Sequence, residues 1–204
     1  MRIYKGLKIL KKYTVYDPGD DSFLAARHLA KALEKMKGAV VLDMGTGTGI
    51  LGMVAATSQN VKSVTFADIN AHAIENVQDN AKLNKEKIIA QTNFVNTDLF
   101  SKIKGKFDLI IFNSPYLRSG FFFHTEESKA WEGGKKGIEV SMEFLRQAKK
   151  HMKKSSTILI IESSLGSIPD FVAESEALGY SVRKVASVKS LFERIFLFAL
   201  RLED

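Results

Sequence analysis

The chain has 204 residues, of which 45% are hydrophobic and 26% charged, and it contains no cysteine. This composition is typical of one globular domain, and the missing thiols exclude disulfides, thiol catalysis and cysteine-ligated metal. No apolar run approaches the ~20 residues that span a bilayer. The absence of cysteine also fits a cytoplasmic protein. The four histidines form no metal-spaced pair, so we expect no metal site. The net charge of +7 allows contact with nucleic acid or an acidic assembly, or reflects lysine used for solubility.

The hydrophobic pattern alternates between helical and strand periods along the chain. Helices are predicted over 22–38, 48–59, 70–84, 133–152 and 167–180, and strands over 39–44, 63–68, 87–98, 106–112 and 156–163. Residues 180–202 predict two terminal strands that could form a hairpin. Regular β-α-β alternation indicates a mostly parallel sheet with helices on both faces, in one domain over 1–204. Ligands of such sheets bind at the carboxyl ends of the strands.

A glycine-rich turn follows the first of these strands, in VLDMGTGTGILG. Gly45, Gly47 and Gly49 let the chain turn sharply into a helix and let a ligand approach the backbone closely. The spacing departs from the dinucleotide fingerprint, and no Gly-Lys-Ser/Thr follows, so the turn is not a P-loop. Asp43, just before the turn, suits a ligand with a cationic group rather than a phosphate. A plain strand-to-helix turn is the alternative.

Two further acidic residues follow the next two strands. Asp68, in FADIN, lies roughly twenty residues past the glycines, where a carboxylate would bind both hydroxyls of a ribose. Asp98, in NTDLF, could accept a hydrogen bond from the exocyclic amine of adenine. Either acid alone could instead serve a helix start. Together with Asp43 and the glycine turn, they predict a pocket for S-adenosylmethionine, an adenosine that carries no phosphate but does carry an amino-acid cation.

The strand over 106–112 runs into the quartet Asn113-Ser114-Pro115-Tyr116. The side-chain oxygen of Asn113 and the backbone carbonyl of Ser114 could hold both hydrogens of a planar NH2 group, so that the nitrogen faces a methyl donor. Pro115 would stiffen the turn, and Tyr116 would pack its ring against the amide. Asparagine, serine and proline are also turn formers, so a plain strand-ending turn is the alternative for the quartet alone.

In this order, the motifs resemble those of class I S-adenosylmethionine-dependent methyltransferases that methylate amino groups, which carry Asn-Pro-Pro-Tyr or a close variant. VYDPGDDSFLAARHL (15–29) and KAWEGGKKGIEV (129–140) are similar to segments of the HemK-type glutamine methyltransferases, in the short branch found in eukaryotes and archaea. The resemblance implies a seven-stranded, Rossmann-like α/β fold with a mostly parallel sheet and an antiparallel C-terminal strand. It also implies methylation of the glutamine in the Gly-Gly-Gln motif of class I release factors.

The same resemblance implies the rest of the site. An N-terminal helical segment over 1–38 would cover the cofactor. Apart from the resemblance, the apolar and aromatic run FFFHTEE (121–127) could form a substrate wall or lid, or equally a partly buried loop. Ser114 departs from the family's usual proline, which removes one constraint on the turn and affects rate more than mechanism. The residues expected to bind the cofactor are Tyr16, Asp21, Ser22, Asp43, Gly45, Thr46, Gly47, Gly49, Asp68, Ile69, Asp98, Leu99 and Asn113.

The family resemblance also implies a small zinc-binding activator subunit that docks by strand addition, for which the edge strand 87–95 is the candidate. Two other functions stay open. The quartet would equally hold the exocyclic amine of adenine or guanine in RNA or DNA, and the chain could be a non-catalytic S-adenosylmethionine-binding subunit. The basic charge favours nucleic acid, whereas the two branch-specific segments favour a protein glutamine.

Overall fold

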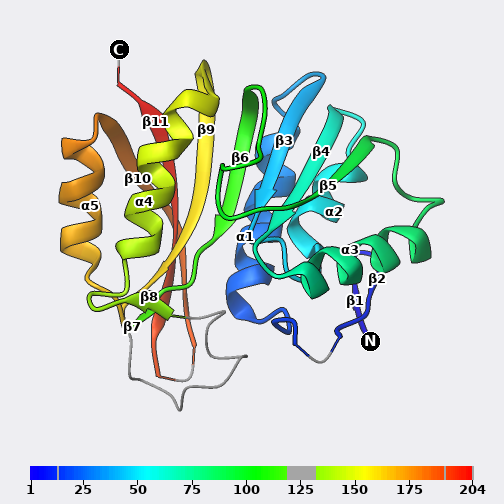
Figure 1. Ribbon diagram of the computed structural model, residues 1–204, viewed down its shortest axis with the longest axis horizontal. Coiled ribbons are helices and arrows are strands. Elements are labelled where there is room, and N and C mark those ends of the chain that lie inside the picture. Colours follow the sequence, from blue (N-terminus) through cyan, green and yellow to red (C-terminus); the bar gives the residue numbers. More distant parts are fainter. Residues whose placement is uncertain (13, 119–131, 191, 204) are drawn as a thin grey trace.

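In the computed structural model, which describes residues 1–12, 14–118, 132–190 and 192–203, a seven-stranded sheet carries helices on both faces (Figure 1). The strand order is β10-β11-β9-β6-β3-β4-β5, and β11 is the one strand of this sheet that runs opposite to the other six. This confirms the predicted fold class. The strands are β3 (Ala39–Met44), β4 (Val61–Asp68), β5 (Gln91–Asn96), β6 (Phe107–Asn113), β9 (Met152–Ser163), β10 (Tyr180–Lys189) and β11 (Arg194–Leu202).

Two hydrophobic cores lie on the two faces of the sheet. Val41 packs into the first core and Leu42 into the second, because successive strand residues point to opposite faces. Both side chains are fully buried, which explains why β3 reads as a continuous apolar run. The first core is covered by α1 (Asp20–Leu33), α2 (Ile50–Ala56) and α3 (Ala71–Leu83), and the second by α4 (Glu139–Ala148) and α5 (Ile168–Ala177).

The strand over 39–44 and the terminal hairpin are confirmed, but several predicted helices are too long. The helix predicted over 22–38 begins at Asp20 and ends at Leu33. The one predicted over 133–152 begins at Glu139, because Gly134 and Gly137 adopt left-handed φ angles of 98° and 75° that a helix does not accept. It ends in a short 3-10 turn, η2 (Lys149–His151).

Two more predictions concern α3 and its neighbour β5. Asn70 caps α3 as predicted, since its side chain accepts from the backbone N–H of His72 at 2.9 Å. The strand predicted over 87–98 is shorter, because Ile89 and Ala90 donate their backbone N–H groups to Ala56 instead of joining the sheet. The edge position expected for 87–95 therefore holds for β5 alone.

The segment 1–38, expected to be helical, begins instead with a hairpin of β1 (Arg2–Tyr4) and β2 (Leu7–Ile9). This hairpin and the chain after it are held by three asparagines spaced four residues apart on α3. The carboxamides of Asn76, Asn80 and Asn84 each accept from one backbone N–H and donate to one backbone carbonyl within residues 8–12, at 2.7–2.9 Å. The helix side chains thus replace a partner strand.

The order of the strands places the site. From β3 the chain moves outward to β4 and β5, then returns to β6 on the other side of β3, so the carboxyl ends of β3 and β6 flank the point where strand order reverses. These ends lie at the bottom of Figure 1, beside the start of α1. A short parallel pair, β7 (Leu117–Arg118) and β8 (Glu132–Gly134), follows β6. The candidate lid 121–127 lies outside the described residues.

Among the described helices, none is both long and apolar enough to cross a membrane.

Candidate active site

The glycine turn after β3 is bent through left-handed backbone conformations. Gly45, Gly47 and Gly49 have φ angles of 62°, 54° and 84°. A Cβ on Gly49 would also lie 2.2 Å from Cγ2 of Val77 on α3, so this position requires glycine on two grounds. The turn is tied to β4, because the N–H of Thr46 donates to the carbonyl of Ala67 at 3.0 Å.

Asp43 lies beneath this turn and is 1% exposed. Its Oδ2 accepts from the Thr46 hydroxyl at 2.6 Å and from the N–H of Gly52 on α2 at 2.8 Å. Burial raises the pKa of Asp43 to about 7, against the opposing effect of these two donors. Asp43 therefore braces the turn against the start of α2, a task that its position in the sequence did not indicate.

Asp68 ends β4 beside the turn and is 9% exposed. Oδ2 accepts from the N–H of Gly47 and Oδ1 from that of Asn70, both at 2.9 Å. Burial raises the pKa of Asp68, while the backbone donors lower it. A carboxylate offers about four lone-pair sites, so two backbone bonds leave acceptor capacity unused.

Ile69, Asp98 and Leu99 complete this end of the sheet. Ile69 follows Asp68 and leaves 70% of its apolar side chain exposed. The exposed Asp98 follows β5, whose end is joined to β4 by the N–H of Thr97 donating to the carbonyl of Asp68 at 2.9 Å. Leu99 takes an unusual φ of 41°, which turns the chain at this point. An exposed apolar side chain directly after the Asp68 carboxylate suits a flat ring with polar edges.

The buried carboxylate of Asp21, in the first turn of α1, gathers the residues expected from the N-terminal motif and the quartet. It accepts from the Tyr16 hydroxyl at 3.0 Å, the Ser22 hydroxyl at 3.1 Å, Nδ2 of Asn113 at 3.0 Å and the Tyr116 hydroxyl at 3.3 Å. These five residues come from two separate parts of the sequence, 16–22 and 113–116. Asp21 therefore fixes which way the Asn113 carboxamide faces.

With its nitrogen turned to Asp21, the Asn113 carboxamide keeps its oxygen free. Asn113 Oδ1 is buried and has no hydrogen-bond partner among the described residues. An unpaired buried acceptor costs about 1–3 kcal/mol, so it is ordinarily found where a ligand completes it. The arrangement presents one fixed acceptor at the carboxyl end of β6, which can hold an N–H group.

The charges around the two tyrosines are acidic. Burial raises the pKa of Tyr16 and of Tyr116, and the carboxylates of Asp21 and Glu193 raise both further. Glu193, between β10 and β11, accepts from the Ser163 hydroxyl, and its own pKa is raised by burial and by Asp21. The motifs gave no indication of Glu193, since the fold brings it here from the far end of the chain.

Ser114 turns its side chain inward rather than toward the crevice. The hydroxyl donates to the carbonyl of Ile161 on β9 at 2.6 Å and lies 3.3 Å from Oε1 of Glu162. Sequence reasoning missed Glu162, although a glutamate inside the apolar run ILIIES was a visible signal. No hydrogen bond to the backbone carbonyl of Ser114 is found within the described part of the chain.

Two solved structures with the same architecture are described as methylating proteins. The chain superposes on a chain of the E. cuniculi Mtq2–Trm112 complex, described as responsible for methylation of the eRF1 translation termination factor, with a TM-score of 0.70. The two are 22% identical, with 94% of this chain and 100% of that one covered. The ribosomal protein L11 methylase of Lactobacillus delbrueckii gives a TM-score of 0.68 at 18% identity, over 100% and 90% of the two chains. The fold is that of a class I methyltransferase.

The family described as "Methyltransferase small domain" matches residues 15–188, and the chain belongs to it. It is 33% identical to the "Putative protein N5-glutamine methyltransferase" of Methanocaldococcus jannaschii, over 95% of this chain and 94% of that one. It is 34% identical to the release factor glutamine methyltransferase of Borreliella burgdorferi over 64% of its length, and spans 48% of that relative. It is 31% identical to ribosomal RNA small subunit methyltransferase C of Haemophilus influenzae over 69%, and spans 37% of that relative.

Proposed function

We propose that this methyltransferase transfers a methyl group from S-adenosylmethionine to the side-chain nitrogen of a protein glutamine, that of the Gly-Gly-Gln motif in a class I release factor. The observation that carries the proposal is the free, buried Oδ1 of Asn113, oriented by Asp21 at the carboxyl end of β6. The relative that matches nearly the whole chain is named for the same reaction class.

The described residues fit S-adenosylmethionine. Asp68 keeps lone pairs for a ribose diol, Ile69 offers an apolar surface to adenine, and Asp98 lies exposed beyond β5 for the ring's amine. When bound, the cofactor supplies a methyl group on a positively charged sulfur. The acidic surroundings of Asp21 and Glu193 favour a cation in this crevice. Asp43 would act through the glycine turn that it braces.

Asn113 and Ser114 would position the acceptor amide. A glutamine nitrogen is a weak nucleophile, because its lone pair is delocalised into the carbonyl. Asn113 Oδ1 and the backbone carbonyl of Ser114 would each accept one N–H, so that the nitrogen is aligned with the methyl group, and orientation of this kind lowers a barrier by up to ~7–11 kcal/mol. The N–C bond would form as the S–C bond breaks and leaves its electron pair on sulfur, and the nitrogen would release one proton to solvent. Tyr116, anchored at Asp21, would supply the flat wall of the site.

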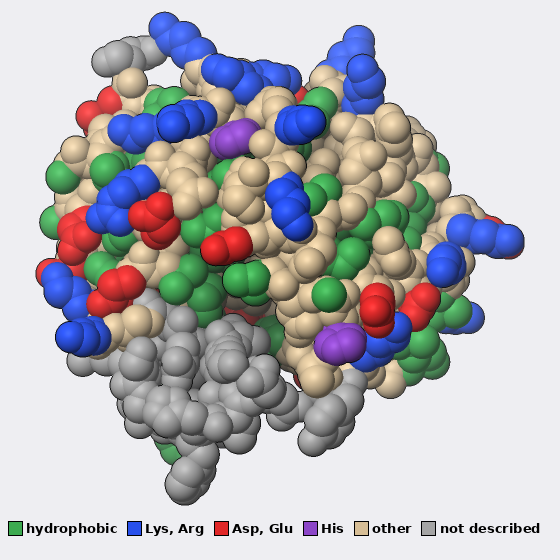
Figure 2. All heavy atoms as spheres, viewed as in Figure 1, with side chains coloured by type: hydrophobic (Ala, Val, Ile, Leu, Met, Phe, Trp, Pro, Cys, Tyr) green, Lys and Arg blue, Asp and Glu red, His purple; other side chains and the backbone are tan. Residues whose placement is uncertain are grey.

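Charge separates this reading from methylation of RNA or DNA, which the Haemophilus relative represents. Asp21 and Glu193 next to Tyr116 would repel a phosphate backbone. A group of lysines lies instead at the opposite end of the parallel strands, along the upper edge of Figure 2. The exposed members of this edge are Lys35, Lys37, Lys62, Lys104, Lys106, Lys150 and Lys154.

A competition assay tests the proposal. Labelled methyl donor is offered with a Gly-Gly-Gln release factor, the same factor with the glutamine replaced by alanine, bulk tRNA, rRNA and DNA. Label on the intact release factor alone is expected, whereas label on RNA or DNA and never on the protein would refute the glutamine assignment. Asn113→Ala should abolish transfer while the cofactor still binds, and Asp68→Ala should weaken cofactor binding itself. Asp17→Asn, on an exposed carboxylate, is the control.

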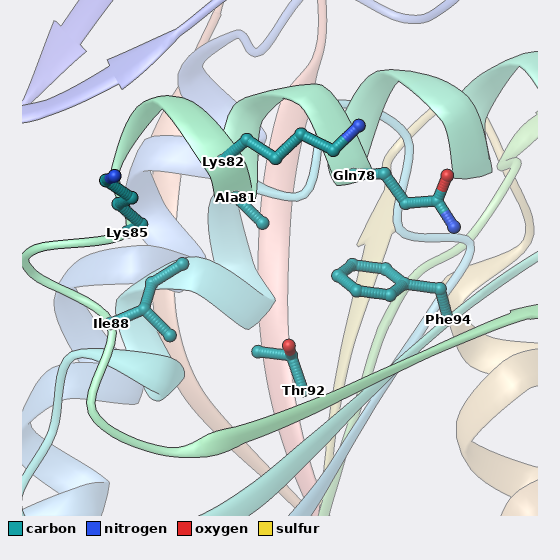
Figure 3. A pocket seen from close by; sticks show the side chains of 7 residues that line it. All are labelled: Gln78, Ala81, Lys82, Lys85, Ile88, Thr92 and Phe94. Carbon is teal, nitrogen blue, oxygen red and sulfur yellow. The ribbon is translucent and has the colours of Figure 1, made fainter.

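We also propose that a small zinc-binding subunit docks at the edge of the sheet. β5 pairs with β4 on one side, and between β5 and α3 lies a groove lined by Gln78, Ala81, Lys82, Lys85, Ile88, Thr92 and Phe94. In Figure 3 the side chains of Ile88, Thr92 and Phe94 lie below the helix, and Lys82 runs along it. Nearby Ile89 is 58% exposed. An apolar strip beside an edge strand suits strand addition.

Co-purification with a Trm112-type subunit tests this docking site. Ile89→Glu should reduce complex formation at least tenfold, because it places a charge on the apolar strip. Ile3→Glu, at a side chain that is 67% exposed in β1, is the matched control and should bind normally. Equal binding by both variants would place the partner elsewhere.

A further inference from the structure

A buried polar cluster lies directly beneath the Asn113-Ser114-Pro115-Tyr116 turn. Asn113 pairs with Ile161 in the β6–β9 ladder, which puts Ser114 next to Glu162. From the other side α4 contributes Ser141. Ser114 is 3% exposed, and Glu162 and Ser141 are fully buried. The proposed reaction uses none of these three side chains. Ser114 nevertheless belongs to the turn that would hold the acceptor amide, and Glu162 lies against it.

The hydrogen bonds of the cluster are limited by the number of protons that its side chains carry. Ser114 has one hydroxyl hydrogen and two neighbouring acceptors, the Ile161 carbonyl at 2.6 Å and Glu162 Oε1 at 3.3 Å. The shorter contact takes the hydrogen. The longer contact is then a hydrogen bond when Glu162 itself carries a proton and donates to Ser114 Oγ. The result is a directional chain from Glu162 through Ser114 to the Ile161 carbonyl.

The surroundings of Glu162 favour the protonated form. Burial raises the pKa of Glu162 to about 8, and the hydroxyls of Ser141 and Ser114 oppose this rise. The turn after β6 contributes Ser114, α4 contributes Ser141 and β11 pairs through Phe196, so no charged group of the described chain shifts this carboxyl. Glu162 Oε2 and Ser141 Oγ make no well-formed hydrogen bond, which leaves an ionised carboxylate poorly stabilised.

We propose that Ser114 is a positioning residue, held by the proton on Glu162, which fixes the turn between β6 and β7 so that its backbone carbonyl can orient the acceptor. Pro115 already restricts the backbone of Ser114 to extended conformations, and the hydroxyl fastens it to β9. Loss of the Glu162 proton makes the carboxylate compete with the Ile161 carbonyl for the single hydrogen of Ser114. The turn then loosens, although Asn113 and the cofactor residues are intact.

The test is the pH profile of methyl transfer at saturating cofactor, which rests on the proposed function. Wild type should lose at least tenfold in kcat between pH 7 and 9.5. Glu162→Gln keeps a donor to Ser114 at every pH, so it should exceed wild type at pH 9.5. Ser141→Ala removes a hydroxyl that lowers the Glu162 pKa, so the alkaline loss should move to higher pH. Glu176→Gln, an exposed glutamate on α5, should follow wild type.

Two measurements without a substrate separate this proposal from the proposed function. Carboxyl NMR should show Glu162 titrating near pH 8. The protection factor of the Tyr116 amide, which is corrected for the intrinsic rise of exchange with pH, should fall above that pH in wild type but not in Glu162→Gln. If the protein methylates no release factor but shows both effects, the proposed roles of Glu162 and Ser114 stand and only the assigned substrate is refuted. Superimposable pH profiles for wild type and Glu162→Gln, or Tyr116 protection that does not change when Glu162 titrates, would refute the proposed roles of Glu162 and Ser114.

Discussion

Replacing Asn80 by aspartate tests the asparagine ladder, the row of Asn76, Asn80 and Asn84 side chains that holds the N-terminal segment over α3. The carboxamide, 0% exposed, accepts from the N–H of Leu10 at 2.9 Å and donates to the carbonyls of Leu10 at 2.8 Å and Thr48 at 2.9 Å. Asn80→Asp preserves shape and the accepted bond. It loses two donated bonds and aims an oxygen at two carbonyl oxygens. At about 1 kcal/mol for each lost bond plus the buried charge, we expect a loss near 3 kcal/mol.

Urea unfolding at pH 7 measures this loss, with Asn93→Asp on the exposed side of β5 as the matched control. Part of the loss should return at pH 4, because a protonated carboxyl at position 80 can again donate one hydrogen bond. A change below 1 kcal/mol for Asn80→Asp, or an equal change in the control, would refute the ladder as a stabilising feature. Cofactor binding should weaken as well, since Thr48 belongs to the glycine turn.

Three other predictions concern stability. Gly49→Ala should destabilise by more than the ~1–2 kcal/mol of left-handed strain alone, because its Cβ would meet Val77, and adding Val77→Ala should recover the steric part in a double-mutant cycle. Tyr180→Phe removes a buried 2.7 Å bond to the Leu145 carbonyl and should cost about 1–2 kcal/mol in urea unfolding. Asp43 binds its proton more tightly when folded, with a pKa raised from 3.8 to about 7. Stability should therefore fall as pH rises through that window, by about tenfold in the unfolding constant per pH unit, and Asp43→Asn should remove this slope.

The arrangement of acidic and basic groups bears on how the substrate approaches. A net charge of +7 taken from composition favours a nucleic-acid partner, but it does not say where the charge lies. The lysines preceding β3, β6 and β9 lie at the amino ends of the strands, whereas Asp21 and Glu193 lie at the carboxyl ends. Part of the positive charge that the composition records therefore lies at the end of the sheet away from the proposed site.

The sequence by itself determined the α/β class, the parallel core and the place of the site, because these follow from local patterns. An unbroken apolar run such as 106–112 requires cover on both faces, and a glycine turn after a strand marks the carboxyl end of a sheet. Helix ends were predicted less well, since Gly134 and Gly137 shorten α4 through backbone conformations that periodicity does not reveal.

The tertiary structure alone decided what each side chain faces. Asp43 follows its strand just as Asp68 does, yet Asp43 is turned under the glycine turn, and Asp68 lies beside it. Asp21 is 92 residues from Asn113 in the chain, and only folding makes it the group that orients the carboxamide. Ser114 read as a departure from a family motif until β9 placed Glu162 against it. Contacts of this kind join residues far apart in sequence, so they depend on how strands and helices pack and leave no trace in local spacing.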